Sequence, residues 1–77
     1  MERLPILSGR KIIKGLQKIG YRETRQKGSH IRLSYLNKKP ITVPDYRAIS
    51  RNLLRKILRD AEISVEGFFK APLAIRR

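Results

Sequence analysis

The chain contains no cysteine, and only six of its 77 residues are acidic, against 19 lysines and arginines. Without cysteine it can form neither a disulfide framework nor a thiolate zinc site, which suits a reducing cytosol. It has no apolar run close to the length of about 20 residues that a membrane-spanning helix needs. Charged residues such as Glu2 and Arg3 break up any signal-peptide pattern at the N-terminus. We therefore expect a cytoplasmic protein.

The acidic deficit leaves a formal net charge of +13. Such an excess of one sign repels itself and predicts a polyanionic partner: nucleic acid, an anionic membrane surface or an acidic protein. A chain of this length makes one domain, 1–77, that removes only about 60% of its unfolded surface from water. We expect its core to span about residues 8–69 and residues 70–77 to form a flexible basic tail.

Two helices are predicted. Apolar residues recur at helical spacing between Ser8, a suitable N-cap, and Gly20, a suitable C-terminal stop. Gly15 inside this segment disfavours a helix unless another element packs close to it. Ser50 can cap a second amphipathic helix. Phe68 and Phe69, beyond it, are predicted to cover the core.

One side of the second helix carries a basic row four residues apart, formed by Arg51, Arg55 and Arg59. The simplest explanation is a solvated face. An electrostatic track for RNA or for an acidic protein partner explains it equally well.

Between the helices, three short segments have strand character. Residues 21–26 form a polar strand, and residues 30–35 alternate strictly between apolar and polar. A third strand, Ile41 to Val43, is ended by Pro44. The pattern predicts an α+β domain of order α-β-β-β-α, with two helices on one face of a three-stranded antiparallel sheet, the layout of double-stranded-RNA-binding domains.

The chain's only histidine, His30, lies in its most basic, turn-like stretch. Histidine can give and take protons near neutral pH. The alternation places His30 on the wet face of the sheet, where the cations of the stretch can hold a phosphate. The candidate phosphate-binding residues around it are Arg25, Lys27, Gly28, Ser29 and Arg32. Each also has an ordinary explanation, because surface histidines, solvated cations and glycine turns are common.

The acidic residues are too scattered to predict a metal site, and no cofactor motif is present. A histidine beside phosphate-binding groups is what RNA cleavage without a metal ion requires. His30 is therefore the candidate catalytic residue.

Several elements together resemble the HicA toxin family. The resemblance covers about residues 8–69 and is carried by Ser8-Gly9, Gly20-Tyr21, Gln26-Lys27-Gly28-Ser29-His30, Thr42-Val43-Pro44-Asp45 and Leu54-Arg55-Lys56-Ile57-Leu58. It implies a toxin of a type II toxin-antitoxin system, an mRNA interferase with a double-stranded-RNA-binding-like fold. It also implies a catalytic histidine matching His30 and neutralisation by a HicB-type antitoxin.

The chain departs from the family at Tyr46, where many members carry a second histidine. A phenol in that place can still stack on a base or donate a hydrogen bond, so Tyr46 joins the candidate RNA-binding residues.

Three alternatives remain from the residues alone. A non-catalytic double-stranded-RNA-binding module would use the same charge without cleavage. A helix-turn-helix DNA reader is disfavoured by the strand-rich middle. An interaction protein with an acidic partner is compatible with either of the RNA functions.

Overall fold

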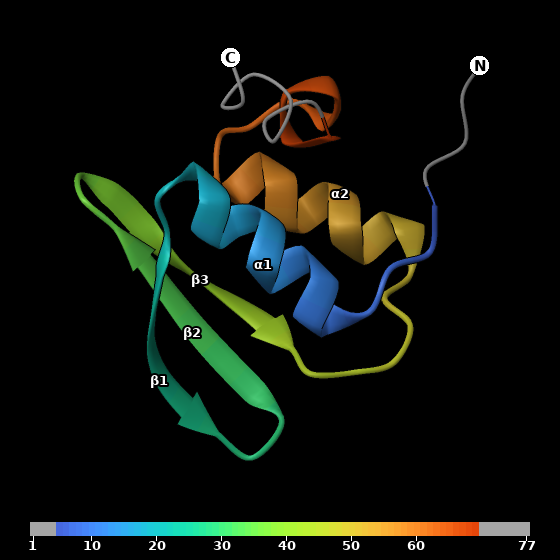
Figure 1. Ribbon diagram of the computed structural model, residues 1–77, viewed down its shortest axis with the longest axis horizontal. Coiled ribbons are helices and arrows are strands. Elements are labelled where there is room, and N and C mark those ends of the chain that lie inside the picture. The colour runs from blue at the N-terminus through green and yellow to red at the C-terminus, as the bar shows by residue number, and fades with distance from the viewer. Residues whose placement is uncertain (1–4, 70–77) are drawn as a thin grey trace.

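The computed structural model describes residues 5–69. Three strands form one antiparallel sheet in the order β1-β2-β3, and both helices lie on the same face of it (Figure 1). The elements are α1 (Gly9–Ile19), β1 (Arg22–Lys27), β2 (His30–Tyr35), β3 (Lys38–Pro44) and α2 (Arg51–Asp60). The predicted order and fold class are confirmed. The predicted basic tail, 70–77, lies outside the described residues.

Both helices begin where their capping residues predict. The Ser8 hydroxyl accepts a hydrogen bond from the Lys11 N–H (3.2 Å), and the Ser50 hydroxyl accepts one from the Leu53 N–H (3.1 Å). Each bond satisfies a backbone donor that the first turn leaves free. At the other end of α1, Gly20 takes φ 134°, a conformation that favours glycine and ends the helix.

The core lies between the helices and the inner face of the sheet. Ile31 and Leu33 of β2 are fully buried there, while Arg32 between them faces outward. β3 is longer than the predicted Ile41–Val43 because its pairing with β2 extends from Lys38 to Pro44. The strand can include Pro40, because β3 is an edge strand and one of its sides is unpaired.

The packing of Phe68 explains why a glycine occupies position 15 inside α1. A Cβ on Gly15 would lie 2.6 Å from the Phe68 Cζ, so the phenyl ring occupies the space that a side chain would need. Phe68 is buried at 6% exposure and belongs to the core. The prediction that Phe69 also covers the core is wrong, because Phe69 is 36% exposed. Consecutive residues of a helical turn point about 100° apart, so only one of them can face inward.

Within the described residues no helix combines the length and the apolar character needed to cross a membrane.

Candidate functional site

The outer face of the sheet carries two rows of paired residues, separated by one row that points inward. In the first row, His30 of β2 lies between Lys27 of β1 and Pro44 of β3. In the second row, Arg32 lies between Arg25 and Thr42, whereas the row between the two carries Ile31 inward. Because directly paired residues share a face of the sheet, the pairing places His30 beside cations on the side away from the helices.

These side chains line one shallow depression of about 170 Å³. Its lining residues are Arg25, Lys27, His30, Arg32 and Thr42, and none of them is acidic. His30 is exposed, as the alternation predicts. Thr42 was missed by the sequence reading, although its place between the buried Ile41 and Val43 is the same period-two signal. Four of the predicted site residues are thus brought together.

The β1–β2 turn forms the end of this site. Gly28 has φ +60° and no atom within 4 Å of where a Cβ would stand, so its backbone is open to an approaching group. The Gln26 side-chain amide donates a hydrogen bond to the Gly28 carbonyl (3.1 Å). The Ser29 carbonyl accepts a hydrogen bond from the Asp45 N–H (2.6 Å). The turn is therefore held both from within and by the segment that follows β3.

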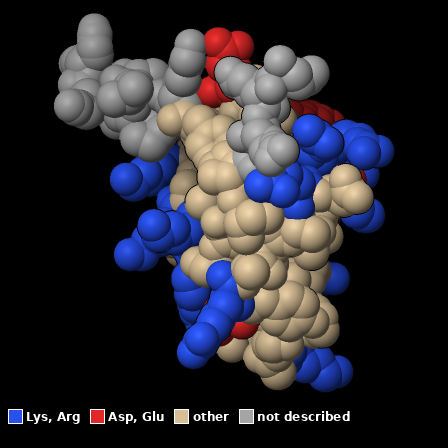
Figure 2. Space-filling model, turned by 90° about the vertical axis from the view of Figure 1, so that its right-hand side faces the viewer, with Lys and Arg blue, Asp and Glu red and all other residues tan. Residues whose placement is uncertain are grey.

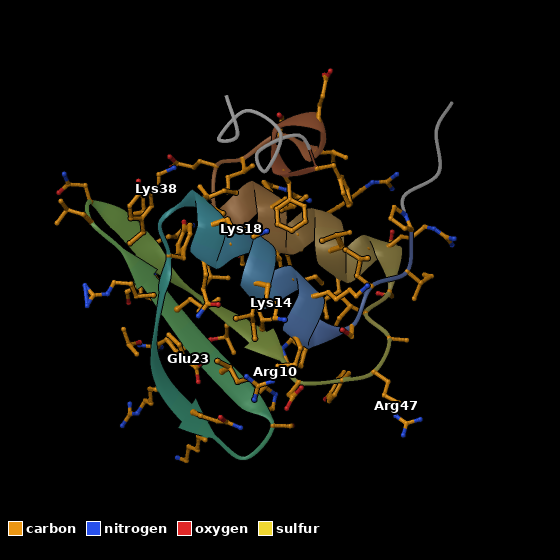
Figure 3. All side chains as sticks on the ribbon, in the orientation of Figure 1. Arg10, Lys14, Lys18, Glu23, Lys38 and Arg47 are labelled. Atoms are coloured by element: carbon orange, nitrogen blue, oxygen red, sulfur yellow. The ribbon has the colours of Figure 1, made fainter. Side chains whose placement is uncertain are left out.

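The same segment is fastened to the start of α1. The Gly9 N–H donates a hydrogen bond to the Tyr46 carbonyl (2.8 Å), and the Arg10 guanidinium lies 3.4 Å from the Asp45 carboxylate. A second oxygen contact joins Arg10 to Glu23 of β1 at 4.0 Å; Figure 3 shows these two side chains close together. Gly9 must lack a side chain, because a Cβ there would collide with the Pro44 carbonyl oxygen. Through Asp45, the helix end thus supports the turn that carries His30.

Tyr46 is the predicted site residue that belongs neither to the depression nor to the β1–β2 turn. Its side chain is 50% exposed in the loop between β3 and α2, and it does not line the depression around His30. Its predicted contact with RNA is therefore not part of that cluster.

A larger depression, of about 610 Å³, lies toward the opposite end of the sheet. Arg22, Ser34, Tyr35 and Leu36 are among its lining residues, and it contains no histidine. Its greater size does not make it the better catalytic candidate, because proton transfer near neutral pH needs a suitable side chain. Among the described residues, no group of three His, Cys, Asp or Glu side chains is placed to hold a metal ion.

Positive side chains dominate the surface. Figure 2 shows Lys and Arg along both margins of one face of the molecule, with few Asp and Glu visible. Glu23 of β1 and Asp45, which follows β3, are both engaged by Arg10. The charge around His30 is therefore not offset within its own depression.

Fold and site together define a small, basic α+β protein whose open sheet face carries a histidine–cation cluster. A family model described as the HicA toxin of bacterial toxin-antitoxin matches residues 9–63, and the chain belongs to this family.

A solved structure supports the same assignment. It comes from a toxin-antitoxin complex of Streptococcus pneumoniae, with a TM-score of 0.68 and 28% sequence identity, and the match covers 74% of this chain and 98% of that one. No curated protein matches.

Proposed function

We propose that this HicA-family toxin is an endoribonuclease that cuts mRNA in the cytoplasm without a metal ion, with His30 as its proton-transfer residue. The observation that carries the proposal is the exposed His30 imidazole in one depression with Arg25, Lys27 and Arg32. A phosphodiester placed there meets a proton carrier and fixed positive charge together. Membership of the toxin family adds support.

RNA supplies its own nucleophile, the ribose 2′-OH. As general base, His30 takes the 2′-OH proton while the 2′ oxygen bonds to phosphorus and the bond to the 5′ oxygen breaks. As general acid, it would instead protonate that 5′ oxygen. Such proton transfer contributes ~10²–10⁴-fold to the rate. With one histidine, the complementary proton transfer falls to water or another group, so we expect modest turnover.

The other predicted residues bind the substrate. The guanidinium groups of Arg25 and Arg32 match phosphate oxygens in a forked geometry, and the Lys27 ammonium supplies a point charge. These cations would stabilise the charge that develops on the phosphate oxygens. The open backbone at Gly28 and Ser29 allows a phosphate to approach the turn. The exposed Tyr46 ring is available to stack on a base beyond the depression.

Family membership and the net positive charge both support an antitoxin as the protein partner. The similar chain in Streptococcus pneumoniae was solved in a toxin-antitoxin complex. We propose that a HicB-type antitoxin neutralises this type II toxin by covering the outer face of the sheet, where acidic side chains would meet the excess of positive charge. Co-expression with the cognate antitoxin should restore growth that the isolated chain arrests.

The test of catalysis is an RNA digest in EDTA comparing the wild type with His30→Ala. Ser34→Ala is the matched control, because Ser34 lies on the same strand outside the depression. We expect the wild type and Ser34→Ala to leave 2′,3′-cyclic phosphate or 3′-phosphate ends, and His30→Ala to remain folded but inactive. DNA should be spared, because it lacks the 2′-OH.

Cleavage that requires Mg²⁺, or that His30→Ala leaves undiminished, would refute this mechanism. Salt-dependent binding of RNA that stays intact would instead establish the alternative, a non-catalytic double-stranded-RNA-binding module.

A further inference from the structure

The solvent face of α1 is positively charged along its whole length. Its exposed residues are Arg10, Lys11, Lys14, Gln17 and Lys18. At 3.6 residues per turn they occupy about a third of the circumference of the helix. Figure 3 shows Arg10, Lys14 and Lys18 following one another along α1. The helix contains no acidic residue.

Within residues 5–69, three of these cations have no counter-charge. Arg10 is engaged by Glu23 and Asp45, but no acidic partner within the described residues reaches Lys11, Lys14 or Lys18. We name these three residues the lysine stripe. On α2, by contrast, the one lysine, Lys56, is paired with Asp60 one turn later (3.4 Å).

Most of the lysine stripe is placed unfavourably for the stability of the helix, and only Lys18, in the last turn, suits the helix dipole. Like charges three and four residues apart repel each other, and this applies to Lys11 with Lys14 and to Lys14 with Lys18. Lys11 also lies in the first turn, where the helix dipole favours negative charge. The stability of the helix therefore does not account for Lys11 and Lys14, whereas binding to an anion accounts for all three lysines.

The composition of this face indicates which anion. Protein interfaces have apolar, aromatic-rich centres and are depleted in lysine. The exposed face of α1 has no apolar side chain among its lysines, only Gln17. A sugar-phosphate backbone needs nothing but regularly placed positive charge. The chemistry thus favours RNA over an acidic protein.

The location of the lysine stripe decides what part of the RNA it can meet. α1 buries Ile12, Ile13 and Leu16 against the inner face of the sheet, so its lysines face away from the sheet. His30 lies on the outer face. Because the two groups lie on opposite sides of the sheet, a strand of RNA must pass around an edge to reach both.

We propose that the lysine stripe binds the backbone of long RNA substrates at nucleotides away from the bond that is cut. This inference rests on RNA being the substrate, as proposed above. The lysine stripe then adds affinity for long RNA and takes no part in the chemistry, and a short oligonucleotide held at His30 does not reach it.

The test measures RNA binding by fluorescence anisotropy in the His30→Ala background, so that no cleavage occurs. Lys11→Gln, Lys14→Gln and Lys18→Gln are combined in one variant. Lys39→Gln, an exposed lysine on β3, controls for loss of one charge from the chain. Far-UV circular dichroism shows that each variant is folded. Each protein is titrated with a long single-stranded RNA and with a tetranucleotide over a series of salt concentrations.

For long RNA we expect the combined variant to raise Kd on the order of tenfold at low salt, and to lower the salt slope by about 0.7 for each lysine. Affinity for the tetranucleotide should not change, nor should Lys39→Gln have more than a small effect. Equal weakening for both lengths, or no weakening, overturns the proposal. The proposal is also overturned if the combined variant no longer binds the antitoxin but keeps its affinity for long RNA. A wild-type protein that binds long RNA but never cuts it would contradict the proposed nuclease activity and leave the proposal for the lysine stripe standing.

Discussion

The two faces of the sheet differ in what they do, although they are made by the same three strands. On the inner face, Ile31 and Leu33 are fully buried, and among the described residues no charged side chain is buried with them. On the outer face, His30 and Arg32 alternate with them and remain exposed. In this domain, stability therefore depends on the buried residues of a strand, and the proposed chemistry depends on the exposed residues that alternate with them. The two can be separated by mutation.

The two faces are connected through the loop after β3. There the Asp45 N–H holds the Ser29 carbonyl, and Gly9 of α1 holds the Tyr46 carbonyl. A change at this junction should affect both faces, whereas a change on either face should affect only that face.

The largest separation is expected between two neighbours on β2. Leu33→Ala should lower the free energy of unfolding by about 2–5 kcal/mol, since it leaves a cavity in the core. Arg32→Ala should change that free energy by less than about 0.5 kcal/mol and yet weaken RNA cleavage. Urea unfolding followed by circular dichroism measures the free energy of unfolding of both variants, and the RNA digest measures their cleavage. If Arg32→Ala unfolds the domain as readily as Leu33→Ala, the two faces are not independent.

A smaller effect on both faces is expected from Gly9→Ala. The added Cβ meets the Pro44 carbonyl oxygen, so α1 and the loop must separate, at a cost of about 1–3 kcal/mol. The displaced loop also releases the Ser29 carbonyl, and RNA cleavage should fall with stability. Gln17→Ala, on the exposed face of the same helix, is the control. A Gly9→Ala variant with native stability and full activity would show that the junction does not couple the faces.

Tyr21 offers a stabilising change on the inner side. Its side chain is 2% exposed, and its hydroxyl has no hydrogen-bond partner. Burial, with smaller contributions from Glu62 and Tyr35, raises the pKa of this phenol above its ordinary value of 10.0. Tyr21→Phe should raise the free energy of unfolding by about 1 kcal/mol, because an unsatisfied buried group is removed.

The raised pKa also has a pH dependence of definite sign. Only the unfolded chain ionises Tyr21 near pH 10, so the wild type should lose stability as pH rises through and beyond that value. The advantage of Tyr21→Phe should therefore widen in alkaline solution. Thermal unfolding at neutral and alkaline pH measures the difference, and a difference that narrows would contradict the assignment.

The smallest effect on stability is expected at the β1–β2 turn. Asn tolerates the positive φ of Gly28, and the space around it is open, so Gly28→Asn should cost less than about 0.5 kcal/mol. Its RNA cleavage rate then reports directly on backbone access for a phosphate. A lowered rate at native stability supports such an approach, while an unchanged rate assigns Gly28 to the turn alone.

Much of the fold could be predicted because its signals are local. Ser8 and Ser50 cap the helices by bonds to residues three positions on. The alternation correctly placed His30 and Arg32 on the outer face and Ile31 and Leu33 on the inner one, but it fails at Tyr35, which is exposed.

Other features depend on residues far apart in the chain. The extension of β3 beyond Ile41–Val43 comes from its pairing with β2. The contact of Arg10 with Asp45 joins positions 35 residues apart, and no periodic pattern indicates it. Tyr46 was grouped with the site from its position in a motif, but the loop carries its side chain outside the depression.

The order of residues alone determined the helix ends, the strand periodicity and the excess of positive charge, because capping, alternation and ionisation depend on each residue and its near neighbours. Tertiary structure alone decided that the lysines of α1 face away from His30, that Phe68 fills the space at Gly15, and that Asp45 supports the Ser29 turn. These depend on how whole elements pack, and packing is set by the shape of the shared core rather than by any one segment.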